Sequence, residues 1–426
     1  MNRSLLRNRD FLLVSCAVGL SALGDWVAMV ALGLHVKAMS DSGFVVAALW
    51  ICLFGPSVLV AGHAGLLVDR IEAGRLLALV SAAGAAVALA LGFLDSVVPV
   101  LALTTLLGAA LAISSPAEFA LVPAIAGEER IQAANGHMET IRYIGFGLGP
   151  VLGGLLYAAG GLQLAMVVDA LTFALVAGAA LALRVRREPA ALKEDQRAPR
   201  ARDGVAFLFA DRTLALVMVV AFASLLFMSA VWVGELFFVE DVLGKGDVSY
   251  GAMLSIWTAG MALGALLLSP RVAAYALATV GLAAATAQGL ALALPAIWLS
   301  FAFFLACAFG GGVAHGLKNV MFRSLIHIQV PDELHGRAFA AYNGIRNSAE
   351  LGAFAAGGVL VAAIGARGTL AIAGGLSALA GAAGLLTLLR RYGGWAPTSP
   401  VGPPAPDPRT MPPDPPVPLA GDAEAP

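Results

Sequence analysis

Twelve apolar stretches, each long enough to cross a membrane as a helix, constrain this chain more than any other feature. A helix needs ~20 predominantly apolar residues to span the hydrocarbon core of a bilayer. Only 12% of the residues are charged, whereas soluble domains hold about a quarter. We therefore predict an all-α integral membrane protein with twelve transmembrane helices. The stretches are 11–37, 43–67, 75–95, 97–119, 133–159, 162–184, 213–239, 248–270, 274–294, 296–320, 338–364 and 368–390.

Basic residues concentrate on one side of the predicted membrane. In the odd-numbered connections between the stretches, the only basic residues are Lys37, Lys245 and Arg367. The connections on the other side are rich in Lys and Arg, which marks the cytoplasmic side. We therefore predict a multi-pass protein of the inner (plasma) membrane with both termini in the cytoplasm. The cytoplasmic basic residues include Arg3, Arg7, Arg9, Arg70, Arg75, Arg130, Arg184, Arg186, Arg187 and Lys193.

A basic polar segment divides the chain into two similar halves. We predict six helices in residues 1–183, a cytoplasmic basic linker at 184–212 and six more helices in 213–391. Residues 392–426 are Pro-rich and are expected to be a disordered cytoplasmic tail. Pro123 and Asn135 recur as Pro331 and Asn343, both 208 residues later. This repeat predicts a duplication of six helices, an architecture typical of transporters.

Two motifs identify a family. The first is GLLVDRIEAGR after the second stretch, and the second is GHMETIRYIGFGLGPVLGG at the fifth. Together with the six-plus-six layout, they resemble the major facilitator superfamily. The second motif resembles the antiporter motif of its drug–proton antiporters, through Gly136, Gly145, Gly149, Pro150, Gly153 and Gly154.

The resemblance extends to a subgroup and to residue roles. SALGDW, SSPAEFALVP and VVDALTF resemble the siderophore exporters (enterobactin-exporter-like) and the macrolide-efflux-like proteins. The first motif implies a gating loop, although Glu72 replaces a usual glycine and Ala73 a usual basic residue. The gating residues that the resemblance implies are Gly65, Asp69, Arg70 and Arg75.

The glycines of the antiporter motif predict close helix packing. Gly145, Gly149 and Gly153 recur every four residues and therefore share one helical face. Glycine lets membrane helices approach closely, and Pro150 bends the helix. We expect a kinked packing surface between the two halves, with ordinary tight packing as the alternative.

Ionisable residues within the stretches are functional candidates because their burial is costly. Asp25 ranks first, because the first span lines the substrate cavity in the architecture that the resemblance implies, and an apolar cavity disfavours the charged carboxylate. Its predicted role is proton coupling or the binding of a cationic substrate; the alternative is a structural carboxylate bonded to a neighbouring helix. Glu139 and Arg142 are predicted to pair along one helix, beside the same cavity. Arg346 and Glu350 are predicted to form a comparable i,i+4 pair in the eleventh stretch. For both pairs the predicted role is a gate or an arginine that faces an anion, and the alternative is a local ion pair near the cytoplasmic interface.

Three other ionisable residues receive structural explanations. Asp169 is expected to have a structural role in the sixth stretch. Glu235 and Lys318 are predicted to lie near the ends of their stretches and to reach water.

The sequence favours proton-coupled efflux of a small amphipathic molecule, such as a drug, siderophore or secondary metabolite, by alternating access. Its partners would be this substrate, protons and the lipid bilayer, without nucleic acid, and the protein would be a monomer. No HExxH, paired CxxC or Walker pattern is present, so we expect no enzyme, metal or cofactor. The alternatives are an importer, a lipid flippase and a non-transporting sensor. The predicted aromatic wall consists of Phe222, Phe227, Trp232, Phe301 and Phe304.

Overall fold

The computed structural model describes residues 5–127, 130–185, 201–331 and 334–392. Most of the predicted linker and nearly all of the predicted tail lie outside these ranges. The described residues are helical and contain no β-strand. The long helices are α1 (Arg9–Met39), α2 (Gly43–Arg70), α3 (Ala73–Leu91), α4 (Val97–Ala126), α5 (Ile131–Leu181), α7 (Arg212–Phe237), α8 (Asp247–Ala262), α9 (Leu277–Ala293), α10 (Phe301–Gln329) and α11 (His335–Tyr392).

Two of these helices are each long enough for two membrane spans. α5 has 51 residues and α11 has 58, whereas one span needs only ~20. Each is interrupted by a non-helical glycine, Gly161 with φ 62° and Gly365 with φ 70°. This left-handed conformation is strained for residues with a Cβ, so glycine permits the bend. With α5 and α11 each counted as two, twelve helical segments correspond to the twelve predicted stretches, which confirms the all-α membrane fold.

Several helices differ in extent from the predicted stretches. α10 ends at Gln329 rather than at residue 320, and α4 ends at Ala126 rather than at 119. Helical hydrogen bonds continue beyond the apolar residues, so hydropathy marks the hydrocarbon and not the helix end. A short helix, α6 (Ala201–Ala210), also lies within the predicted linker. Its Phe207 and Leu208 are buried in the core that includes Leu214 of α7.

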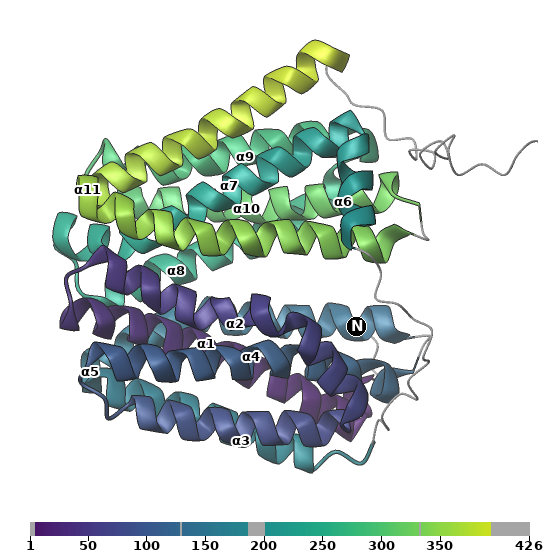
Figure 1. Cartoon of the computed structure of the whole chain (residues 1–426), viewed down its shortest axis with the longest axis vertical. Helices are drawn as coiled ribbons and strands as arrows, with labels where there is room; N and C mark the ends of the chain where they lie inside the picture. The colour runs from purple at the N-terminus through teal and green to yellow at the C-terminus, as the bar shows by residue number, and fades with distance from the viewer. Residues whose placement is uncertain (1–4, 128–129, 186–200, 332–333, 393–426) are drawn as a thin grey trace, which may run out of the picture.

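The helices form two groups, α1–α5 and α6–α11, stacked one above the other in Figure 1. In the first group, α1 and α3 pack on α5, and α2 packs on α4. In the second, α7 and α9 pack on α11, and α8 packs on α10. Between the groups, α5 packs on α8 and α2 packs on α11. These two interfaces are counterparts, because each joins the second helix of one half to the fifth segment of the other.

The predicted 208-residue offset relates contacts in three dimensions. Between the halves, Gly251 lies against the Pro150 carbonyl, and Gly43 lies against Gly358. Gly251 follows Gly43 by 208 residues, and Gly358 follows Pro150 by the same interval. The offset therefore places equivalent close contacts in both interfaces, as expected for a duplicated chain.

The same offset also holds within the halves. Gly108 of α4 lies against the Leu53 carbonyl of α2, and Gly316 of α10 lies against the Met261 carbonyl of α8. A Cβ added at either glycine would collide with that carbonyl oxygen. Both halves therefore use glycine at the same place to bring two helices into backbone contact.

Gly316→Ala and Gly108→Ala are expected to destabilise the protein to a similar degree. Overpacking of this kind costs about 1–3 kcal/mol, because a backbone carbonyl cannot rotate away from the new methyl group. Thermal unfolding of the purified protein in detergent measures the effect. Gly310→Ala on α10 is the matched control, since a Cβ added there would meet nothing within 4 Å among the described residues. Equal unfolding midpoints for Gly316→Ala and Gly310→Ala would contradict the proposed close contact.

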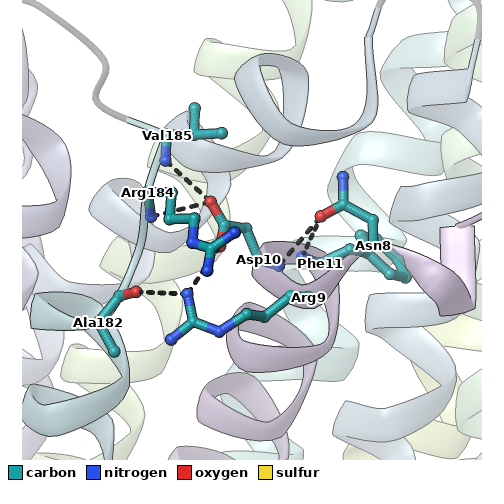
Figure 2. A network of polar contacts seen from close by, with 7 residues as sticks. All are labelled: Asn8, Arg9, Asp10, Phe11, Ala182, Arg184 and Val185. Atoms are coloured by element: carbon teal, nitrogen blue, oxygen red, sulfur yellow. Dashed lines mark hydrogen bonds and ion pairs between the residues drawn. The ribbon is translucent and has the colours of Figure 1, made fainter.

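The end of the bundle that carries the N-terminus is held by a polar network, which Figure 2 shows. The Asn8 side chain caps α1 by accepting a hydrogen bond from the backbone N–H of Asp10 at 3.0 Å. Asp10 in turn accepts from the backbone N–H of Arg184 at 2.9 Å and of Val185 at 2.8 Å. Arg9 donates to the Ala182 carbonyl at 3.0 Å. The start of α1 is therefore tied to the segment that follows α5. We call this the terminal end of the bundle and the opposite one the far end.

Candidate substrate and proton site

Two neighbouring cavities lie between the helix groups. The first-half cavity, with a volume of about 300 Å³, is lined by Asp25, Glu118 and Arg142 among others. The second-half cavity, of about 180 Å³, is lined by residues that include His315, Lys318 and Arg346. A single water needs ~10–15 Å³ measured in this way, so either cavity has room for far more than isolated waters. The residues that line both cavities are Trp26, Phe146, Trp232 and Glu350.

Asp25 lies in the first-half cavity, about 24 Å along α1 from its first residue at 1.5 Å per residue. Ser21, one turn earlier, donates to Asp25 Oδ2 at 3.4 Å. Asp25 Oδ1 is buried and has no hydrogen-bond partner among the described residues. An incompletely bonded carboxyl group in an apolar setting is a group that can take up and release a proton.

Arg142 pairs with a different acid from the one predicted. Its Nη2 lies 3.5 Å from Oε2 of Glu118 in α4, and its guanidinium lies 4.9 Å from the centre of the Phe119 ring. Glu139 is exposed and lines neither central cavity. The predicted Glu139–Arg142 pair is therefore wrong. An i,i+3 spacing permits a Glu139–Arg142 pair. Arg142 pairs with the buried Glu118 instead, because two opposite charges in an apolar cavity offset each other's cost of desolvation.

Asp169 lies behind α1, outside both cavities. It is fully buried, and its neighbour Thr172 donates to the Asp169 backbone carbonyl at 2.7 Å. A Cβ added at Gly24 would lie 2.6 Å from Asp169 Oδ1. Asp169 therefore packs against α1 at Gly24, the residue before Asp25. Its structural role remains a prediction.

Glu235 and Lys318 do not reach water as predicted. Lys318 is 2% exposed and Glu235 is 7% exposed, and both line the second-half cavity. α10 continues for eleven residues beyond Lys318, which places this residue about 16 Å from the helix end. For Lys318 the prediction failed because it located the helix end where the apolar stretch ends; Glu235 does lie near the end of α7, but its side chain is buried.

Aromatic side chains separate the two cavities. The Trp26 ring centroid lies 5.5 Å from Phe146 and 6.1 Å from Trp232. Of the predicted wall residues, Trp232 alone lines these two cavities. Phe304 packs on Phe238 at 5.4 Å instead, and Phe222 is 39% exposed on the surface.

Most of the antiporter-motif glycines face α1 of their own half. A Cβ at Gly145 would lie 2.8 Å from that of Ala22, and one at Gly149 would lie 2.6 Å from that of Trp26. A Cβ at Gly153 would lie 2.9 Å from the Val27 carbonyl oxygen. This face of α5 therefore holds the segment of α1 that carries Asp25 and Trp26.

The other three residues of the motif, Gly136, Pro150 and Gly154, do not face α1. Gly154 and Pro150 contact α8, where a Cβ at Gly154 would lie 2.8 Å from the Asp247 carbonyl oxygen. At Gly136 an added Cβ would meet nothing within 4 Å among the described residues. The expected surface between the halves is therefore limited to Pro150 and Gly154. Periodicity identified the shared face, but it cannot indicate which neighbouring helix that face meets.

The predicted gating loop is described only in part. For Gly65, Asp69 and Arg70 the structure describes only the backbone, which belongs to α2. Arg75 is exposed, and its Nε lies 3.7 Å from Oε2 of Glu72. The Glu72 carboxylate also caps α3 by accepting from the backbone N–H of Gly74 at 3.1 Å.

Charged side chains join the two halves at the far end. Lys37 Nζ lies 3.0 Å from Glu240 Oε2 and 2.8 Å from Asp241 Oδ1, both beyond α7 in the other half. Nearby, the backbone N–H of Val151 donates to Ser255 Oγ at 3.1 Å. These contacts and the two glycine interfaces hold the halves together at this end.

No group of three or more His, Cys, Asp or Glu residues within the described ranges is arranged to hold a metal ion. The three cysteines, Cys16, Cys52 and Cys307, are free.

Comparison with known proteins agrees with this architecture. The family model of the Major Facilitator Superfamily matches residues 14–353. A point mutant of the nucleoside transporter NupG is similar in structure, with a TM-score of 0.73 and 15% identity, over 88% of this chain and 99% of its own. No curated protein matches in sequence.

Two further solved structures share the fold. A POT family transporter in complex with a thioalcohol conjugated peptide has a TM-score of 0.68 and 9% identity, over 90% of this chain and 96% of its own. A bacterial homologue of the iron transporter ferroportin, in an inward-facing state, has a TM-score of 0.66 and 15% identity, over 90% and 98%. At these identities the likeness concerns the fold alone.

Proposed function

Because this chain belongs to the major facilitator superfamily, and is therefore a membrane transporter and not an enzyme, we propose that it exports a small amphipathic organic molecule in exchange for protons. The observation that carries the proposal is Asp25, a membrane-embedded carboxyl group with an unbonded oxygen in a cavity between the halves. The antiporter motif of α5 supports the direction. Drug, siderophore and secondary metabolite are the candidate substrate classes.

The proposed cycle uses the two ends of the bundle in turn. The contacts of Lys37, Gly43 and Gly251 close the far end. Opening the far end requires these contacts to separate while the terminal end closes, which is alternating access by rocking of two halves. In this proposal the terminal end faces the cytoplasm and the protein lies in the inner membrane, which the asymmetry of basic residues supports.

Asp25 and the Glu118–Arg142 pair are the groups proposed to couple protons to this movement. Protonation removes the charge of Asp25 and so changes the cost of closing the cavity around it. Arg142 compensates Glu118, whereas Asp25 has no basic partner within 4 Å in the described structure.

Uptake of fluorescent lipophilic dyes into proteoliposomes tests this function. Vesicles with the terminal end outward and an acidic lumen are expected to accumulate dye, because protons leaving the lumen drive exchange. A protonophore should remove the accumulation, and protein-free vesicles provide the leak rate. Accumulation only under the reversed gradient would indicate an importer. Movement of labelled lipid without dye transport would indicate a flippase, and no transport under any gradient would contradict the proposal.

A further inference from the structure

Three basic side chains gather in the second-half cavity without a close acidic partner among the described residues. His315 and Lys318 come from α10, and Arg346 comes from α11. His315 and Lys318 are three residues apart on α10 and therefore lie on one face of that helix, and Arg346 of α11 lines the same cavity. Lys318 and Arg346 concentrate positive charge in one wall of a mainly apolar cavity, and His315 adds a neutral hydrogen-bond donor beside them.

The hydrogen-bonding capacity of this basic cluster is largely unused. Lys318 is 2% exposed and lines the cavity, and no carboxylate of the described residues lies within 4 Å of its Nζ. Arg346 Nε and His315 Nδ1 are likewise buried without a partner among the described residues. His315 Nε2 accepts a hydrogen bond from Asn319 Nδ2 at 2.8 Å, which leaves Nδ1 as the donor nitrogen of a neutral imidazole. A buried cation without a partner is costly, so this wall of the cavity is suited to a negatively charged group.

The acids of this cavity do not neutralise the cluster. The predicted Arg346–Glu350 pair is wrong: Glu350 lies one turn from Arg346 along α11, but no oxygen of its carboxylate comes within 4 Å of a basic nitrogen of the described residues. The electrostatic attraction between Glu350 and Arg346 therefore acts over more than 4 Å. Glu235 belongs to α7, near its far end, and no basic nitrogen of the described residues lies within 4 Å of its carboxylate. The cluster is therefore available to a ligand.

The remaining wall suits a flat apolar body. Trp257 packs on the His315 ring at a centroid distance of 5.8 Å. Trp26 and Trp232 line the same cavity, together with Leu225, Met228 and Met261. Aromatic faces next to cationic groups recognise molecules with an apolar ring and an anionic end.

We propose that the second-half cavity binds an amphipathic organic anion, with its carboxylate held by Lys318, Arg346 and His315 and its planar body against Trp26, Trp232 and Trp257. This inference rests on the proposed transport function and specifies the charge of its substrate. It separates two tasks, because the basic wall belongs to the second half and the candidate proton carrier Asp25 belongs to the first.

Binding of three matched probes to the full chain in lipid nanodiscs tests the proposal. The probes are 2-naphthoate, its methyl ester and 2-naphthylmethylammonium, which share one ring system and differ in charge. Isothermal titration calorimetry is expected to show at least about tenfold tighter binding of 2-naphthoate than of either other probe, since a charge-assisted contact to a buried site is worth that much. Equal affinities for all three would overturn the proposal.

Lys318→Met is the decisive variant. Methionine keeps an unbranched chain of similar length and removes the unpaired charge, so the fold should be retained. We expect a loss of at least about tenfold in 2-naphthoate affinity and an unchanged affinity for the ester. Lys245→Met is the matched control, because Lys245 lies beyond α7 near the Phe301 ring and outside this cavity. Should Lys318→Met fail to fold, Arg346→Gln is expected to give the same selective loss.

The outcomes separate this inference from the transport function. Unchanged 2-naphthoate binding in both variants, or a drop of equal size for the ester, would overturn the anion site and leave dye transport unaffected. Selective anion binding without transport of any compound would overturn the transport function and leave the site standing.

Discussion

Asp25→Asn is expected to reduce proton-driven dye accumulation to the level of protein-free vesicles while leaving dye binding nearly unchanged. Asparagine has almost the same size as aspartate but cannot take up or release a proton. Since Asp25 Oδ1 has no hydrogen-bond partner in the described structure, the substitution should cost little packing energy. Uptake under an imposed gradient and equilibrium dye binding are the two measurements.

Asp95→Asn is the matched control for this experiment. Asp95 is exposed in the connection between α3 and α4, so the same chemical change there should leave uptake at the wild-type rate. Gradient-driven accumulation that survives Asp25→Asn would exclude Asp25 from proton coupling. In that case Glu118→Gln is the next variant, because Glu118 is another carboxyl group of the first-half cavity.

Gly251→Leu is expected to abolish transport by preventing closure of the far end. Any Cβ at Gly251 collides with the Pro150 carbonyl oxygen of the other half, and leucine adds three further carbons. A backbone carbonyl within a membrane helix cannot move aside, so the two halves must separate there. Dye accumulation in proteoliposomes measures the loss, and Gly43→Leu should behave similarly because it lies at the equivalent interface.

Gly246→Leu provides the control for Gly251→Leu. It lies five residues earlier, and an added Cβ there would meet nothing within 4 Å in the described structure. We expect it to transport normally, and thermal unfolding of both variants shows whether either has lost its fold. Wild-type transport by folded Gly251→Leu would show that this interface need not close tightly during the cycle.

Much of the fold follows from the one-dimensional pattern of the chain. Membrane crossing depends on the length of an apolar stretch, which is a local property, so the twelve segments and their order are readable from composition. The 208-residue repeat between Pro123 and Pro331 is also local information, and it reappears as equivalent contacts at Gly43 and Gly251. Asp25 could be singled out because any carboxylate in a membrane span is costly.

The second-half cavity is largely hidden from the sequence. Lys318 and Glu235 lie near the ends of apolar stretches, but their side chains are buried in the structure. The prediction that they reach water is therefore wrong, because the end of an apolar stretch does not mark the membrane surface. His315 has no recognisable metal or catalytic spacing, so no sequence signal marks it. The available clue is the joint presence of Lys318 and Arg346, one in each of two segments that meet at the cavity.

The sequence by itself determined the membrane class, the number and order of the spans, the duplication and the glycine face of α5, because each depends on residues close together in the chain. Only the tertiary structure decided that Arg142 meets Glu118, that the glycines of α5 mostly face α1, and that Lys318 joins a buried basic cluster. These outcomes depend on the rotation of each helix about its axis and on the identity of its neighbours. Both are set by packing among segments that lie far apart in sequence, which no periodicity within one segment encodes.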